Sequence, residues 1–161
     1  MNAEDKINGK VFQLESLLQR IAFWRQMGDT IVFTNGCFDI LHPGHVKLLA
    51  GCAQLGDRVI VGLNSDASVK RLKGETRPVN NEKSRLQLLA SNMLTDAVIL
   101  FEEDTPEKLI QAIKPDVLVK GGDWTTDKIV GARFVQGYGG KVQTVPYLEG
   151  HSTTSIIERA K

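Results

Sequence analysis

The sequence predicts an α/β protein in which a parallel sheet is covered by helices on both faces. Short apolar runs without polar alternation recur along the 161 residues, as in strands that are buried on both faces. Between these runs, apolar residues repeat with the spacing of amphipathic helices. Strands that alternate with helices form parallel sheets, and this length fits one domain. We therefore expect residues 1–161 to form a single domain.

Five strands are expected, at residues 30–34, 58–63, 97–101, 116–119 and 141–145. Because crossovers between parallel strands are right-handed, strands in this rhythm suit a Rossmann-like doubly wound sheet with the order 3-2-1-4-5. Ligands bind such sheets beyond the carboxyl ends of the strands. The segments that follow the first, fourth and fifth strands are therefore the expected walls of a site.

Helices are expected between the strands, each starting at a capping residue or a proline. Apolar residues at 14, 17, 18, 21 and 24 predict a helix that ends at Gly28, so residues 1–28 are expected to be a helical extension packed on the domain. Residues 46–55 form the expected helix after the first strand. The other expected starts are Ser65, Asn80 or Asn81, Pro106 as a first helical residue, and Ser152 or Thr153.

Charge and composition exclude several classes of partner. The chain has 20 basic and 19 acidic residues, and a net charge of +1 is too small to attract nucleic acid or an anionic membrane. Two cysteines give no disulfide framework and fit a reducing compartment. There is no signal-peptide pattern and no apolar run of membrane-spanning length. We expect a cytoplasmic protein with no nucleic-acid or membrane partner.

The most informative segment is residues 34–45, which read TNGCFDILHPGH. It joins a buried strand to a helix, so His42 and His45 lie near a helix N-terminus, where free N–H groups and the helix dipole favour an anion. Residues three apart share one helical face, so both imidazoles can reach one group. Gly36 and Gly44 permit a close approach of the backbone. Zinc is the alternative, but the cysteines and His151 lack metal-ligand spacing.

The HPGH stretch resembles the HxGH signature of the nucleotidyltransferase superfamily, which includes cytidylyltransferases, pantetheine-phosphate adenylyltransferase and class I aminoacyl-tRNA synthetases. Residues 152–157 resemble the second signature of this superfamily, before the last helix. His151 and Ile157 stand where some relatives carry isoleucine and arginine, so another cation must neutralise the phosphates. The candidates are the basic cluster after the second strand, Lys70, Arg71, Lys73, Arg77, Lys83 and Arg85, together with Lys47.

The strand-end rule and the resemblance together predict the site residues. The expected catalytic residues are His42, His45 and Lys73, and the expected contacts of the substrate phosphate are Lys47 and Arg71. Asp39 is expected to hold the turn, with contact to a metal–phosphate group as the alternative. Trp124 either packs over the ligand or covers the core. The expected nucleotide-binding residues are Asn35, Gly36, Cys37, Phe38, Gly44, Arg85, Lys120, Gly121, Asp123, Ser152, Thr153 and Thr154.

The reaction that the resemblance implies is attack of a phosphate monoester on the α-phosphorus of a nucleoside triphosphate, with release of pyrophosphate. The second pKa of such a monoester is about 6, so the nucleophile is mostly dianionic at neutral pH and needs no general base. Positioning and charge neutralisation then carry catalysis, with Mg²⁺ as the expected cofactor. The charge of the histidines stays open, because phosphate favours imidazolium and a helix N-terminus favours the neutral ring.

Four further segments, residues 64–74, 77–80, 101–106 and 115–123, look like the adenylyltransferase half of bacterial bifunctional ADP-heptose synthase. That likeness implies ATP and D-glycero-β-D-manno-heptose 1-phosphate as substrates, and ADP-heptose for the lipopolysaccharide inner core as product. The length leaves no room for a sugar-kinase domain, so we expect an excised domain or a stand-alone form supplied by a separate heptose kinase. Family likeness also suggests a homodimer.

Three alternatives stay open. Glycerol-3-phosphate cytidylyltransferase shares both signatures at a similar length. Pantetheine-phosphate adenylyltransferase matches in length but usually has a TxGH-type first motif. A nucleotide-sensing module without turnover is disfavoured by the intact His42, His45 and Lys120.

Overall fold

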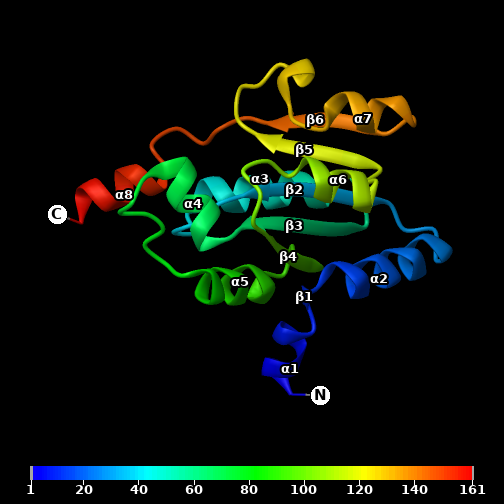
Figure 1. The fold of residues 1–161 in the computed structure, drawn as a ribbon, viewed down its shortest axis with the longest axis horizontal. Coiled ribbons are helices and arrows are strands. Elements are labelled where there is room, and N and C mark those ends of the chain that lie inside the picture. Colours follow the sequence, from blue (N-terminus) through cyan, green and yellow to red (C-terminus); the bar gives the residue numbers. More distant parts are fainter. Residues whose placement is uncertain (1, 161) are drawn as a thin grey trace.

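The computed structural model describes residues 2–160 and contains one six-stranded sheet in this range (Figure 1). All neighbouring strands are parallel, in the order β1-β4-β3-β2-β5-β6. The strands are β1 Val11–Phe12, β2 Ile31–Gly36, β3 Arg58–Asn64, β4 Ala97–Phe101, β5 Val117–Gly121 and β6 Lys141–Val145.

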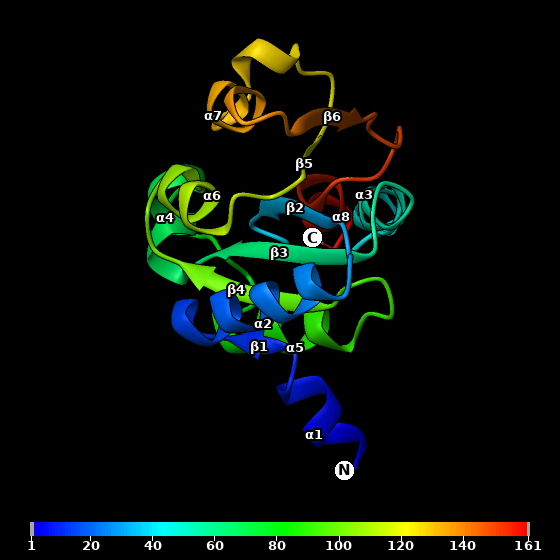
Figure 2. The ribbon, with the colours of Figure 1, turned by 90° about the vertical axis from the view of Figure 1, so that its right-hand side faces the viewer.

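Helices cover both faces of this sheet (Figure 2). One apolar core joins the sheet to α2, α6 and α7, and a second core joins the opposite face to α3 and α5. None of the helices within residues 2–160 combines the length and apolar character needed to span a membrane. The helices are α1 Ala3–Asn8, α2 Leu14–Gln26, α3 Pro43–Ala53, α4 Asp66–Lys73, α5 Glu82–Ser91, α6 Glu107–Ile113, the 3₁₀ helix η1 Thr126–Lys128, α7 Ala132–Gly137 and α8 Thr153–Arg159.

Alternate side chains of the central strands enter opposite cores, as the uninterrupted apolar runs predict. In β2, Ile31 and Phe33 belong to the core with α2, whereas Val32 belongs to the core with α3. All three side chains are fully buried. The sheet is therefore a rigid layer between two cores, and its carboxyl-end loops start from fixed positions.

The predicted count of five strands is wrong, because β1 adds a sixth at the edge beside β4. The five expected strands keep the expected relative order. Val11 and Phe12 pair with Val98 and Ile99, and two residues are too few to show a strand period in the sequence. The expected helical extension at residues 1–28 is thus α1, β1 and α2, with Gly28 in the left-handed region after α2.

Helix starts agree with the predicted caps in three places. The side chains of Ser65, Asn81 and Ser152 accept capping hydrogen bonds at the starts of α4, α5 and α8. Pro106 is the N-cap of α6 and not its first helical residue, which corrects that prediction by one position. The helix after β2 begins at Pro43, three residues earlier than expected, with His42 as its N-cap.

Helix α2 is an integral part of one core, so truncating it should destabilise the domain. Leu17 is fully buried, and Leu17→Ala is expected to cost about 2–5 kcal/mol of unfolding free energy, as for other buried leucines. Phe23 on the same helix is 53% exposed, so Phe23→Ala serves as the matched control. Urea denaturation of the three proteins measures both changes, and equal stability of all three would contradict the placement of α2.

Candidate functional site

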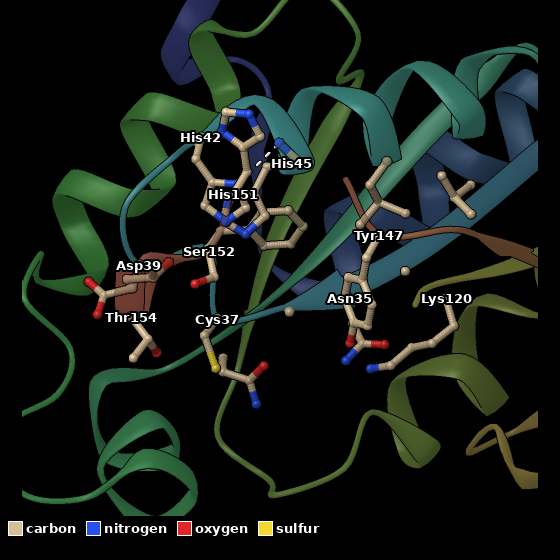
Figure 3. Close-up of a pocket in the computed structure, with 18 of the residues that line it drawn as sticks. Asn35, Cys37, Asp39, His42, His45, Lys120, Tyr147, His151, Ser152 and Thr154 are labelled. Atoms are coloured by element: carbon tan, nitrogen blue, oxygen red, sulfur yellow. Dashed lines mark hydrogen bonds between the residues drawn. The ribbon is translucent and has the colours of Figure 1, made fainter. Parts of the chain in front are cut away.

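A cavity of about 930 Å³ opens beyond the carboxyl ends of the strands. Figure 3 shows His42, His45 and His151 grouped on one wall, with Asn35, Lys120 and Tyr147 farther along the cavity. Most of the residues expected from the sequence line it: Asn35, Gly36, Cys37, Phe38, Asp39, His42, Gly44, His45, Lys73, Lys120, Gly121, Ser152, Thr153 and Thr154. Four others, Lys47, Arg71, Arg85 and Asp123, do not belong to its lining.

The turn between β2 and α3 is held by its own side chains. Nδ1 of His42 accepts a hydrogen bond from the Gly44 N–H at 3.1 Å, which caps the helix, and Pro43 occupies the first helical position. A Cβ at Gly44 would lie 2.8 Å from the His42 ring, so only glycine fits. The geometry of the cap thus explains why the first histidine and the glycine of this motif stand two residues apart.

The two imidazoles of this turn are stacked, with ring centroids 3.8 Å apart. Burial lowers the pKa of His45 to about 4, with a smaller contribution from His42. Burial also lowers the pKa of His42, assisted by His151. Both rings are therefore neutral at pH 7. Because Nδ1 of His42 accepts a hydrogen bond, its proton is on Nε2, and the ring is a hydrogen-bond donor without a charge.

Positive charge comes from other residues in the cavity. Lys73 and Lys120 both line it, and neither has a salt-bridge or hydrogen-bond partner within residues 2–160. Burial lowers the pKa of Lys120, which Lys73 lowers further. Burial raises the pKa of the Cys37 thiol even though the surrounding cations oppose this, so Cys37 is a neutral neighbour of these cations. The cavity therefore suits an anionic ligand, whose negative charge would pair with Lys73 and Lys120.

Asp39 holds the turn, as the first of its two expected roles requires. Its buried carboxylate accepts hydrogen bonds from Arg77 Nε at 2.7 Å and from the backbone N–H groups of Val79 and Asn80, each at 2.9 Å. Burial alone would raise its pKa, but these donors hold the pKa below its usual value. Both carboxylate oxygens are occupied by these donors.

Arg85 is a fully buried arginine behind the cavity wall. Its guanidinium donates to the carbonyl oxygens of Asn80, Cys37 and Asn64 at 2.9, 2.7 and 2.8 Å, and to the Asp66 carboxylate at 2.8 Å. It thereby joins the β2–α3 turn, the end of β3 and the segment before α5. Arg85 was expected to contact the nucleotide. The structure instead places it outside the cavity lining, where it holds the backbone of the surrounding segments.

The remaining expected residues lie outside the cavity lining. Arg71 pairs with Asp104 at 2.7 Å on the exposed surface. Lys47 and Asp123 are exposed. Their predicted contacts with substrate stay predictions. Trp124 lines the cavity, is 46% exposed and belongs to neither core, so it does not cover the core; its packing over a ligand stays a prediction.

Sequence reasoning missed the lining residue Tyr147, and it named Arg77 only as one candidate cation without assigning it to the site. Arg77 lay in the basic cluster, but nothing in the sequence indicated that Asp39 would hold it at the cavity. Tyr147 packs on Gly122, where a Cβ would lie 2.6 Å from its ring and φ is +115°. The paired glycines signal a close approach at this point, but they do not identify the approaching group.

Removing the Arg85 guanidinium should lower the unfolding free energy strongly, even when the replacement side chain is of similar size. Arg85→Met leaves three carbonyls without their donor, and we expect a loss of about 3–5 kcal/mol, as for other broken buried ion pairs. Lys83→Met, at an exposed position on the same helix, is the control and should be near neutral. Chemical denaturation distinguishes the two, and similar losses would argue against a special role for Arg85.

The lowered pKa of His45 predicts acid sensitivity of the fold. Below pH 6.5 the unfolded ring binds a proton that the folded ring resists until about pH 4, so the unfolding free energy falls as the pH drops through this window. His45→Gln removes this part of the pH dependence. Urea midpoints at pH 7, 6 and 5 measure it, and parallel curves for both proteins would contradict the buried neutral ring.

Known proteins resemble this chain over most of its length. A sequence profile of the cytidylyltransferase-like family matches residues 33–159. The bifunctional protein HldE of Rhodopseudomonas palustris is 55% identical over 159 residues, which are 99% of this chain and 32% of that protein. HldE of Nitrobacter hamburgensis is 52% identical over 158 residues, which are 98% of this chain and 32% of that protein. The chain thus spans about a third of the length of these curated relatives.

A solved structure is also similar to this chain. A lipopolysaccharide core biosynthesis protein from Thermoplasma volcanium aligns with a TM-score of 0.63 and 31% identity, covering 76% of this chain and 100% of that one. The profile match runs from β2 to α8 and so includes both signature segments and the cavity between them. The chain therefore belongs to the cytidylyltransferase-like family.

Proposed function

We propose that the chain is an adenylyltransferase that joins AMP from ATP to D-glycero-β-D-manno-heptose 1-phosphate, giving ADP-heptose and pyrophosphate. One observation carries the proposal: neutral imidazole donors at the N-terminus of α3 face the same cavity as Lys73 and Lys120, which have no partner among residues 2–160. This combination suits a polyphosphate ligand, because helix N-termini and lysines both favour anions.

In the proposed reaction, an oxygen of the sugar phosphate forms a bond to the α-phosphorus while the bond from this phosphorus to the β-phosphate oxygen breaks. Pyrophosphate leaves with that electron pair. Since the phosphate monoester is largely dianionic at neutral pH, no proton has to be removed from it. The protein has to position the reactants in line and to stabilise charge on the phosphoryl oxygens. We expect His42, His45, Lys73 and Lys120, which all line the cavity, to do this.

The described residues do not form a metal site of their own. No group of three or more histidine, cysteine or acidic side chains among them could hold an ion, and the Asp39 carboxylate is already occupied by its own donors. We infer that Mg²⁺ enters bound to the triphosphate. Mg²⁺ bound in this way neutralises phosphate charge, and no protein ligand is assigned to it.

The choice of substrates rests on likeness. The segments that resemble the adenylyltransferase half of bifunctional ADP-heptose synthase belong to a chain that is 52–55% identical to bifunctional HldE proteins and 31% identical to a lipopolysaccharide core biosynthesis protein. On this proposal the product feeds the lipopolysaccharide core in the cytoplasm. A heptose kinase, on the same polypeptide or separate from it, supplies the sugar phosphate, and the domain assembles as a homodimer.

The alternative is a cytidylyltransferase that acts on glycerol 3-phosphate. The description of the family, cytidylyltransferase-like, favours CTP as the nucleotide, and glycerol 3-phosphate rests on the resemblance of the two signatures. Pyrophosphate release distinguishes the two functions when ATP or CTP is supplied with each heptose 1-phosphate anomer or with glycerol 3-phosphate. Turnover with ATP and the β-anomer alone supports the proposal. Turnover with CTP and glycerol 3-phosphate overturns the substrates and keeps the reaction, whereas no turnover in any combination contradicts both.

The two imidazoles should contribute more to the rate than to substrate binding. His42→Ala and His45→Ala are each expected to lower kcat about 100- to 1000-fold with a small change in KM, by analogy with the loss of an oxyanion-hole donor. Val46→Ala is the control, because Val46 lies on the same helix, is 50% exposed and does not line the cavity. Steady-state kinetics test this, and an unchanged kcat in both histidine variants would refute the assignment.

A further inference from the structure

Asn64 is a buried asparagine that ends strand β3 and lines the cavity. Its side-chain nitrogen donates to the Ser68 hydroxyl oxygen at 3.0 Å, and that hydroxyl donates to the Glu103 carbonyl oxygen at 3.0 Å. Because a carbonyl oxygen can only accept, the single hydroxyl hydrogen of Ser68 is used at Glu103. The amide of Asn64 is therefore fixed, with its nitrogen toward Ser68 and its oxygen, Oδ1, turned away.

This amide oxygen is unused and open to the cavity. Among residues 2–160 it accepts no hydrogen bond, since the Asn64 side chain bonds only through its nitrogen. It is not sealed off either, because the side-chain atoms that are both buried and unpaired belong to Thr34, His45 and Thr95. Asn64 thus presents to the cavity one hydrogen-bond acceptor of fixed direction.

The backbone beneath this acceptor is also held in place. One nitrogen of the buried Arg85 guanidinium, Nη1, donates to the carbonyl oxygens of Asn64 at 2.8 Å and Cys37 at 2.7 Å. The ends of β3 and β2 are therefore clamped together, and Figure 3 shows Cys37 on the cavity wall. Since backbone and amide are both fixed, Oδ1 needs no reorganisation to bind a ligand.

The group that Oδ1 can bind must carry a hydrogen. An ionised phosphate oxygen has none and is itself an acceptor, so Oδ1 disfavours a phosphate at this point. Asparagines in general can turn either end of the amide toward a ligand, but the Ser68 hydroxyl removes that choice here. The ligand atom facing Asn64 is therefore a hydroxyl or an amine.

The sheet order indicates which reactant supplies this group. Strands β3 and β5 flank β2 on opposite sides. Apart from the β2–α3 turn, the expected nucleotide contacts that line the cavity come from the β5 and α8 side, namely Lys120, Gly121, Ser152, Thr153 and Thr154. The β3 side, where Asn64 and Lys73 line the cavity, is left for the acceptor of the nucleotidyl group.

We propose that Asn64 is a specificity-determining residue, whose Oδ1 accepts a hydrogen bond from a hydroxyl of the acceptor sugar phosphate. Ser68 is the positioning residue that keeps this oxygen turned toward the sugar. The inference rests on the proposed function, because that function supplies a sugar phosphate as the acceptor. It goes further in assigning one hydroxyl contact to one atom of this chain.

Kinetics with monodeoxy analogues of the heptose 1-phosphate, each lacking one hydroxyl, test this in the wild type and in Asn64→Ala. In the wild type one analogue should lower kcat/KM about 10-fold, the size of one neutral hydrogen bond. Asn64→Ala should lose about the same factor with the full substrate, mainly through a higher KM for the sugar phosphate. The same analogue should cost this variant nothing more, because the hydroxyl and the amide act as a pair.

Two further variants and a binding measurement separate this role from a structural one. Ser68→Ala keeps the Asn64 oxygen but frees the amide to turn, so it should raise the KM for the sugar phosphate by a smaller factor. Asn8→Ala, at an exposed position outside the lining, is the control and should match the wild type. Calorimetry with α,β-methylene-ATP and Mg²⁺ should give one affinity for all four proteins.

The wild type alone can overturn the inference, if every monodeoxy analogue reacts as well as the full substrate. It is also overturned if each analogue costs Asn64→Ala the same factor as the wild type, or if Asn64→Ala weakens binding of the ATP analogue. These results leave the proposed function intact. Absence of turnover of heptose 1-phosphate by the wild type overturns the proposed function, and the sugar contact with it.

Discussion

The buried guanidinium of Arg85 fixes the backbone on which the cavity is built. A buried charge is costly unless it is fully hydrogen-bonded, and this one is satisfied by the carbonyls of Cys37, Asn64 and Asn80 and by the Asp66 carboxylate. These partners belong to the turn after β2, the end of β3, the start of α4 and the segment before α5, which the sheet brings together at one edge. Their positions are therefore coupled, and none of them can shift without leaving a buried donor unpaired.

Asp39 provides the complementary constraint from the other side of the turn. Its carboxylate accepts hydrogen bonds from Arg77 and from the backbone N–H groups of residues 79 and 80. These bonds connect the β2–α3 turn to the loop before α5. Side chains fixed in this way need little reorganisation when charge develops on a ligand, which is the basis of electrostatic catalysis in preorganised sites.

The sequence predicted the parts of the fold that local patterns control. Five strands, their order and the convergence of three segments at one edge follow from apolar periodicity and the crossover rule. The cap that His42 forms with Gly44 was not predicted, because the helix was expected to begin at Val46. Strand β1 was not predicted, because two residues are too few to show the alternation of a strand. Arg85 was wrongly expected to line the cavity, because its position in a basic cluster does not show whether its side chain is buried. Only tertiary packing places Arg77 and Tyr147 on the cavity wall.

The most direct test of this account is a crystal structure with a non-hydrolysable ATP analogue, Mg²⁺ and the β-anomer of the heptose phosphate. We predict that the α-phosphate lies beside His42 and His45, with an acceptor oxygen in line at about 3–3.5 Å, the distance of a near-attack geometry. A nucleotide whose phosphates lie away from the N-terminus of α3, or an acceptor that cannot approach in line, would contradict the account.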